Sequence, residues 1–410
     1  MYLQLIQRCS TNSVIRHLTR LYHTNTVVSQ QDRYNYDRST QQSRSTPGTT
    51  DSLEFISATA LSSTVRPGGR QSYSGITATV YGATGFLGRY VVHNLGRIGS
   101  QVVVPYRGDG FNTRHLRLAG DLGQIIPIPY EFNDYDSVKQ TMKRSNVVVN
   151  CIGRSYDTAN YSIDDSNVKL TYQLVRAAKD QGVERFIHIS HINADMNSSS
   201  QLYRAKAEAE QIVRYYYPDA TILRSSTIYG AEDKFINYYV AMGKNLFGVP
   251  VTRNGDKLYT PVFVLDVARA VMNSIIYGEA VGKTYTLSGD TMFTEQQICD
   301  LISDNCYFNI RTIPMPEFAM KLYANILSGN RFGNKILNHL RAPSWYNLDM
   351  IEQAKYDELV SSDALTLNDL GIVPTPLLTQ LKTLLISHSG DRGPDRFEKL
   401  DVKPSTAQSL

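Results

Sequence analysis

Gly82, Gly85 and Gly88 are the residues whose spacing most directly indicates chemistry. They recur every three residues between an apolar run that ends at Val80 and a helix-like run that starts at Tyr90. Glycine permits positive φ and lets the backbone approach a ligand closely, while a helix N-terminus offers unpaired N–H groups and partial positive charge. A strand, a tight turn and a helix start in this order predict a dinucleotide site; the alternative is a glycine turn that serves packing alone.

Two arginines bear on which dinucleotide would bind. Arg107 follows the second predicted strand (101–105), where an NAD site carries an acidic residue for the ribose hydroxyl, and Arg89 follows the last glycine. Two guanidinium groups can grip a 2′-phosphate, so these positions favour NADP(H). Asp109 lies two residues beyond Arg107 and keeps NAD open. The alternative for the arginines is two solvated surface cations.

Composition narrows the protein class. The chain has 410 residues, enough for one large or two ordinary domains, and a net charge of +4. No basic stripe with interleaved aromatics suggests nucleic acid, and no apolar run approaches the length of a membrane span. The four cysteines (Cys9, Cys151, Cys299 and Cys306) show no metal or disulfide spacing, and Cys299 and Cys306 are expected to pack in a core. We expect no metal site.

The first 23 residues have the composition of a mitochondrial targeting peptide. No acidic residue precedes Asp32, whereas Arg8, Arg16 and Arg20 are present, and there is no continuous apolar core as in a secretory signal. The alternative is a disordered basic tail. Residues 24–71 are rich in Ser, Thr, Gln, Tyr and Gly, and we interpret them as an extended arm or linker.

From Tyr73 onward, predicted strands and helices alternate, which indicates a parallel sheet with helices on both faces. The fold class is therefore α/β: a Rossmann-like doubly wound parallel sheet in an NADP-binding domain over 72–235, with a smaller mixed C-terminal region over 236–410. The predicted strands are 76–81, 101–105, 125–129, 146–152, 185–190 and 220–224, and the predicted helices are 88–98, 136–144, 166–181 and 200–217. Later segments predict a helix ending at 276, a strand over 282–287, and helical stretches over 294–306 and 314–340.

Several of these stretches carry a resemblance to known proteins. Residues 78–89, 185–190 and 261–267 resemble the atypical short-chain dehydrogenase/reductase superfamily. Residues 81–106, 146–153, 188–194 and 228–235 are similar to the family of 39 kDa accessory subunits of mitochondrial NADH:ubiquinone oxidoreductase (complex I). The resemblance is strongest over 75–235. It implies a non-catalytic subunit that holds NADPH on the matrix-facing arm, near the junction with the membrane.

The superfamily's active members use a Tyr as general acid/base and a Lys four residues later. Here Leu202 stands four residues before Lys206, and Tyr203 stands only three before it. One residue is about 100° of helix, so Tyr203 points away from the required direction. Lys206 can still hold a ribose hydroxyl, while Ser190 would lie beside the cofactor without its Tyr partner. The alternative is an amphipathic helix whose Tyr packs and whose Lys is solvated.

We therefore expect no catalytic residue and a site that binds NADPH. The residues expected to contact the cofactor are Gly82, Thr84, Gly85, Phe86, Leu87, Gly88, Arg89, Arg107, Ile152, Ser190 and Lys206.

The helical stretch over 314–340 places apolar residues such as Phe318 and Leu322 at three- and four-residue spacing, followed by basic Arg331, Lys335 and Arg341. Such a stripe can lie on an anionic membrane surface or against a membrane-arm subunit. The alternative is a lid over the chain's own cleft.

Three functions are compatible with these observations. The first is a structural complex I subunit on the matrix side of the mitochondrial inner membrane, with other complex I subunits and phospholipid as partners and no nucleic acid. The second is an active NADPH-dependent reductase or epimerase that acts on a quinone or lipid-like substrate. The third is a regulator that binds NADPH and a protein partner without turnover. The shifted Tyr203 argues against the second.

Overall fold

The computed structural model describes residues 73–158, 160–244, 248–251, 253–306, 308–328 and 347–386. All of them belong to one compact unit, Ile56–Leu410. The predicted targeting peptide (1–23) and arm (24–71) lie outside the described residues, as do the basic residues Arg331, Lys335 and Arg341.

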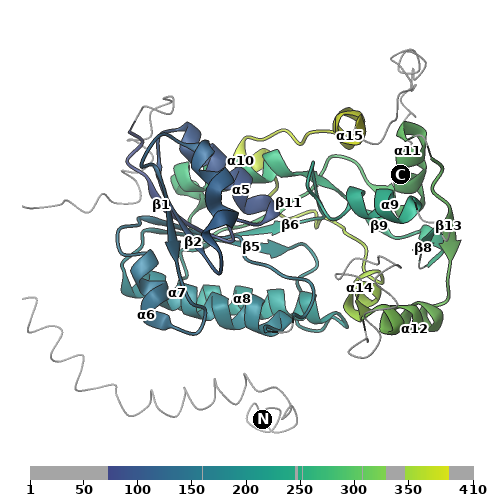
Figure 1. Cartoon of the computed structure of the whole chain (residues 1–410), viewed down its shortest axis with the longest axis horizontal. Coiled ribbons are helices and arrows are strands. Elements are labelled where there is room, and N and C mark those ends of the chain that lie inside the picture. Colours follow the sequence, from purple (N-terminus) through teal and green to yellow (C-terminus); the bar gives the residue numbers. More distant parts are fainter. Residues whose placement is uncertain are drawn as a thin grey trace, which may run out of the picture. The chain divides into compact units, whose positions relative to one another are not determined.

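A seven-stranded parallel sheet forms the centre of the described unit (Figure 1). Its strands lie in the order β11 (Thr284–Leu287), β6 (Thr221–Ser225), β5 (Arg185–His191), β4 (Val147–Asn150), β1 (Thr77–Tyr81), β2 (Gln101–Tyr106) and β3 (Ile125–Pro129). Strand β4 is buried along its whole length. Because both faces of a parallel sheet are covered by helices, its strands are continuous apolar runs such as Val-Val-Val. The order reverses direction at β1, which is the switch point where doubly wound sheets bind ligands.

Helices cover both faces of this sheet. The helices α5 (Phe86–Arg97) and α10 (Val264–Ile276) pack together on one face, and the 3₁₀-helix η1 (Gly110–Ala119) lies beside α5. The other face is covered by α6 (Tyr135–Thr141), α7 (Leu170–Asp180) and α8 (Gln201–Tyr216), as Figure 1 shows. Val91, Val92 and Leu95 of α5 are fully buried, which fixes this helix, and the turn before it, against the sheet.

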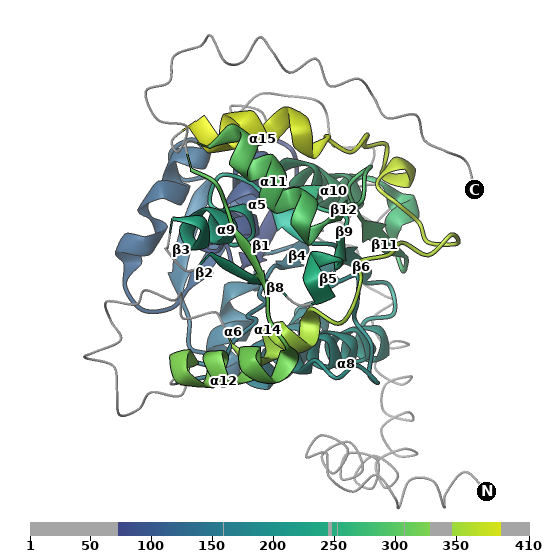
Figure 2. The same cartoon turned by 90° about the vertical axis from the view of Figure 1, so that its right-hand side faces the viewer.

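A smaller region with its own hydrophobic core stands beside the carboxyl ends of the strands (Figure 2). Its helices are α9 (Ile236–Gly243), α11 (Glu295–Asn305), α12 (Glu317–Ser328), α14 (Leu348–Gln353) and α15 (Leu377–Leu385). Its short strands form pairs: β7 (Ile228–Tyr229) with β10 (Val262–Phe263), β9 (Leu258–Tyr259) with β12 (Phe293–Thr294), and β8 (Val249–Val251) with β13 (Thr312–Pro314). The short 3₁₀-helices are η3 (Arg253–Gly255), η4 (Gly278–Ala280) and η5 (Asn368–Leu370).

The structure confirms the predicted fold class. It also shows that α10 and β11, from beyond residue 235, return to the main sheet, so the two predicted domains share one sheet; the boundary at 235 stays a prediction. The predicted helix over 166–181 starts as a π-helix, η2 (Asp165–Lys169), before it continues as α7. Cys299 is buried in the core of the smaller region, and Cys306 is partly buried and packs against the same core, as expected.

Candidate functional site

The glycine turn between β1 and α5 has the geometry of an anion site. Gly82 adopts a φ of +76°, and its carbonyl accepts a hydrogen bond from Gly85 N at 2.9 Å. Helix α5 then begins at Phe86 with no capping side chain among the described residues and no acidic residue in its first turn. The N–H groups of that turn are therefore available to an anion, which the helix dipole also favours.

Gly88 sets how closely α5 approaches this turn. A Cβ at residue 88 would lie 2.2 Å from Gly82 O and 2.6 Å from Ala83 Cα, both backbone atoms. A Cβ at Gly85 would meet Gly82 O at 3.1 Å, a much milder contact. The third glycine is thus the one that the packing of helix on turn requires most strictly.

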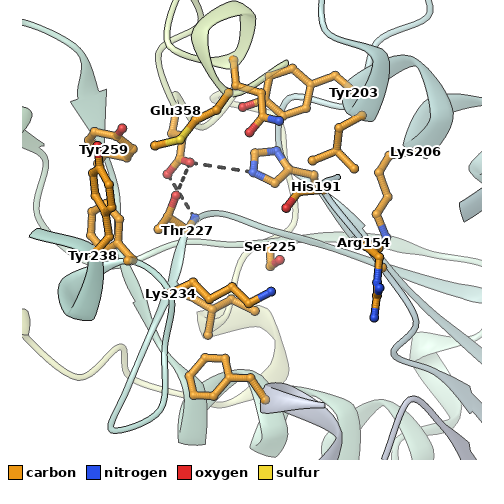
Figure 3. Close-up of a pocket in the computed structure, with 18 of the residues that line it drawn as sticks. Arg154, His191, Tyr203, Lys206, Ser225, Thr227, Lys234, Tyr238, Tyr259 and Glu358 are labelled. Atoms are coloured by element: carbon orange, nitrogen blue, oxygen red, sulfur yellow. Dashed lines mark hydrogen bonds and ion pairs between the residues drawn. The ribbon is translucent and has the colours of Figure 1, made fainter. Parts of the chain in front are cut away.

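A cavity of about 560 Å³ runs from this turn across the ends of β4, β5 and β6 into the smaller region (Figure 3). This is within the usual range of small-molecule sites. Its lining includes many residues that the sequence predicted as cofactor contacts: Gly82, Gly85, Phe86, Leu87, Gly88, Ser190 and Lys206. The predicted contacts Thr84, Arg89, Arg107 and Ile152 do not border this cavity.

Ser190 and Lys206 meet beside the end of β5. The Ser190 side chain is buried, and its Oγ has no hydrogen-bond partner among the described residues, which suits a hydroxyl that a ligand would satisfy. Lys206 Nζ donates to Ile189 O at 3.1 Å, and a Cβ at Gly153 would lie only 2.8 Å from that Nζ. Burial lowers the pKa of Lys206 to about 8, a value that still leaves the amine mostly protonated at neutral pH. The pair fits the ribose side of a dinucleotide.

Tyr203 borders the cavity, but its neighbours differ from those of a general acid/base. Its ring is buried, stacks on His191 with centroids 4.8 Å apart, and contacts Tyr356 edge-on. Burial, and then the charge of Glu358, raise its pKa above the usual value for a phenol. A general acid/base needs the opposite shift, toward the working pH. Leu202 also lines the cavity, where the active superfamily members would place the Tyr.

The far end of the cavity holds buried ionisable groups that sequence reasoning did not find. The Glu358 carboxylate accepts hydrogen bonds from Thr227 N at 3.1 Å and from Thr227 Oγ1 at 2.5 Å (Figure 3). His191 Nε2 lies 3.8 Å from Glu358. Burial, with the positive charges of Lys257 and Lys206, lowers the pKa of His191 to about 3, so this ring is neutral and its contact with Glu358 is no ion pair at neutral pH.

The segment 347–358, which we call the strap, carries Glu358 and closes one side of the cavity. Its Asp349 carboxylate accepts hydrogen bonds from Gln201 N at 2.6 Å, Leu202 N at 3.2 Å and Ser200 Oγ at 3.0 Å. These donors form the N-terminus of α8, so the strap caps the helix that carries Lys206. Only a tertiary contact joins these positions, and nothing local in the sequence indicated it.

The two predicted phosphate-binding arginines have separate partners. Arg89 Nη1 pairs with Glu232 Oε1 at 3.2 Å, and Tyr90 OH donates to the other oxygen of the same carboxylate at 2.9 Å. Arg107 is exposed at the end of β2 and lies over the Tyr161 ring, 5.0 Å from its centroid. Of the two, Arg107 stands where the 2′-phosphate is expected in this architecture.

Two further properties concern the part of the chain that the structure describes. There, no group of three or more His, Cys, Asp and Glu side chains is placed to hold a metal ion. Across the same residues, none of the helices combines the length and apolar character that crossing a bilayer requires.

Comparisons with known proteins agree with this geometry. Residues 78–285 match the NAD dependent epimerase/dehydratase family. The chain is 39% identical over 318 residues to the "NADH dehydrogenase [ubiquinone] 1 alpha subcomplex subunit 9, mitochondrial" of Rattus norvegicus, a match that covers 77% of this chain and 81% of that one. The protein of the same name from Arabidopsis thaliana is 41% identical, over 76% of this chain and 77% of its own.

The fold is also found in enzymes. The triphenylmethane reductase of Citrobacter sp., solved as a complex with NADP(H), superposes with a TM-score of 0.58 at 20% identity, over 75% of this chain and 100% of that one. At this identity the likeness concerns the fold alone. The long matches to the subunit 9 proteins confirm the finer resemblance, and the chain belongs to their family of complex I subunits, which is built on the fold of the NAD dependent epimerases and dehydratases.

Proposed function

We propose that this protein is a non-catalytic accessory subunit of mitochondrial complex I that holds NADPH as a structural cofactor. The proposal rests on one observation: the site has the residues expected to bind a dinucleotide but no Tyr at the position of the general acid/base. The glycine turn, Ser190 and Lys206 border one cavity, whereas Leu202 replaces the general acid/base and Tyr203 has a raised pKa. In such a site the nucleotide contributes binding energy to the fold without turnover.

The chain's own residues would each hold a different part of the cofactor. The N–H groups at the start of α5 would receive the pyrophosphate, Arg107 would pair with the 2′-phosphate, and Lys206 and Ser190 would bond to the nicotinamide side. The chemistry that NADPH itself supplies is hydride donation. A buried Tyr203 with a raised pKa has no driving force to deliver the accompanying proton.

The family membership supports our proposal for partners and location. The relatives are named as complex I subunits of mitochondria, and on that basis we assign this chain to the matrix side of the inner membrane, among the subunits where the matrix arm meets the membrane arm. Helix α12 supports a peripheral contact, since Phe318 and Leu322, one turn apart, are 74% and 59% exposed. An exposed apolar pair of this kind suits a protein neighbour or a phospholipid surface.

The decisive experiment recovers the endogenous protein from mitochondria under mild detergent. Under the proposal, it migrates on native gels with an assembly near a megadalton, and NADP(H) is released from it on denaturation in near-stoichiometric amount. Migration as a small particle with measurable NADPH oxidation would reject the proposal. Release of NAD(H) alone would reject its cofactor while leaving the subunit role in place.

The second candidate is an active NADPH-dependent reductase or epimerase of a quinone or lipid-like substrate. It is favoured by the extension of the cavity beyond Lys206 to the apolar side chains of Met320, Met350 and Ile351, which could contact a second ligand. Steady-state assays on the isolated protein with quinone acceptors test it. Turnover that disappears in Tyr203→Phe, with cofactor content unchanged, would establish the enzyme.

A further inference from the structure

Arg154 and Lys234 are two cations that border the cavity without an ion-pair partner among the described residues. Arg154 follows the end of β4, and Lys234 lies in the loop between β7 and α9, so they reach the same space from separate elements (Figure 3). Each charged group lies 5.2 Å from the centroid of the Tyr156 ring. The two positive charges can therefore be no farther apart than about twice that distance.

Both cations make a cation–π contact with the Tyr156 ring, which offsets part of their mutual repulsion, and an anion between them would offset the rest. The nearest acidic residues in the sequence already have other partners. Asp157 accepts a hydrogen bond from Ile163 N at 2.7 Å, and Glu232 is paired with Arg89. The Asp233 carboxylate is buried and accepts from Gly230 N at 3.1 Å. The protein thus supplies no anion to these two cations from the adjoining segments.

The loops that carry the two cations are held firmly. The carbonyl of Arg154 accepts from Asn167 Nδ2 at 3.0 Å, and the next carbonyl, of Ser155, accepts from Asn347 Nδ2 of the strap at 2.8 Å. Asn167 is buried within the π-helix η2, a distortion that is frequent at functional sites. On the other side, Asp233 ties the start of α9 to the Gly230 turn, next to Lys234. These bonds fix the backbone from which the half-buried Arg154 and the exposed Lys234 reach the cavity.

We propose that Arg154 and Lys234 form a cation pair that holds the pyrophosphate of the dinucleotide, an inference that rests on the proposed function and adds two residues to it. The pair borders the same cavity as Gly85 and Gly88, beside which the pyrophosphate is expected. Arg107, at the end of β2, does not border that cavity. Its proposed contact with the 2′-phosphate is therefore separate from the contact of the cation pair with the pyrophosphate. The backbone N–H groups and the cation pair then contact the pyrophosphate from three elements of the fold.

The test measures the dissociation constants of NADPH and NADH for the full chain by nucleotide fluorescence. The variants are Arg154→Gln, Lys234→Gln and the double substitution, with Arg144→Gln as a control because Arg144 is an exposed cation outside the cavity lining. Both nucleotides share the pyrophosphate, so each single variant should weaken NADPH and NADH by the same factor, about tenfold to a hundredfold. The double variant should also show a shallower salt dependence, and the control should bind like the wild type. Melting temperatures without nucleotide verify that the variants are folded.

Three results would overturn the inference. If the wild type binds tightly and the variants bind equally well, the cation pair does not hold the nucleotide. If the variants weaken NADPH and leave NADH unchanged, the pair reads the 2′-phosphate instead. If the wild type binds neither nucleotide, the proposed function fails and the inference fails with it, and that outcome is recognised before any variant is compared.

Discussion

Replacing Gly88 with alanine should displace helix α5 from the glycine turn. The added Cβ would stand 2.2 Å from Gly82 O, and a Cβ essentially never comes closer than 3.0 Å to another heavy atom. Because both atoms belong to the main chain, no side-chain rotation relieves the contact. The helix must move outward by most of an ångström, which draws its own fully buried residues Val91, Val92 and Leu95 away from their packing on the sheet.

The magnitude follows from two opposing terms. Overpacking of a rigid core costs about 1–3 kcal/mol, and a clash between backbones belongs at the upper end, about 3 kcal/mol. Alanine is favoured over glycine inside a helix by about 1 kcal/mol. The net loss is about 2 kcal/mol, which corresponds to a fall in melting temperature of about 3 °C for a domain of roughly 300 residues. Nucleotide affinity should fall by about tenfold or more, since the N–H groups that receive the pyrophosphate move with the helix.

The assay is thermal melting of the nucleotide-free protein, followed by titration with NADPH. Gly278→Ala is the matched control, because no heavy atom lies within 4 Å of its added Cβ and its φ is not positive. We expect that control to stay within about 0.5 kcal/mol of the wild type. If Gly88→Ala melts with the control and binds NADPH normally, the close approach of helix and turn is not what the third glycine provides.

Four further predictions test separate parts of the site. Arg107→Ala should weaken NADPH by about tenfold and leave NADH unchanged, and equal weakening of both in a binding titration would contradict its pairing with the 2′-phosphate. Tyr203→Phe should leave nucleotide content, assembly and electron transfer of the complex unchanged; a large loss of activity with nucleotide retained would contradict a non-catalytic Tyr203. Burial lowers the pKa of Lys206 from 10.5 to about 8. The unfolded chain therefore binds this proton more tightly, and the free energy of unfolding of the nucleotide-free protein should rise between about pH 8 and 10.5, by about 3 kcal/mol relative to Lys206→Met; parallel curves for the two proteins in urea melts would refute the shift. Phe318→Ser combined with Leu322→Ser should leave the melting temperature unchanged and loosen attachment in carbonate or salt washes of the membranes, and unchanged retention would exclude this face as the contact.

The parts of the site that the sequence predicted are those encoded within a few residues. The glycine turn, the apolar strand before it and the helix after it lie in one short segment, and α5 begins two residues before the predicted start. The orientation of Tyr203 relative to Lys206 could also be predicted, because a spacing of three residues instead of four rotates a side chain by about 100° around a helix.

The remaining parts depend on tertiary contacts. Glu358 meets Thr227 across 131 residues, and Asp349 meets Gln201 across 148, so no periodicity or motif connects them. Arg154 follows a correctly predicted strand, yet its relation to Lys234 requires the fold that brings β4 beside the β7 loop. The π-helical start of α7 was predicted as ordinary helix, since its residues show the same apolar pattern in either form.

The capping of α8 by Asp349 has a consequence for the order in which the molecule is made. A chain that grows from its N-terminus exposes the start of α8 while 148 further residues are still to come. At about 5–20 residues per second, the carboxylate arrives about 7–30 s after the helix it completes. During that interval the first N–H groups of α8 depend on Ser200 and water, and Lys206 stands on a frayed helix. The nucleotide site can therefore be completed only after about 85% of the sequence, up to Asp349, has been synthesised.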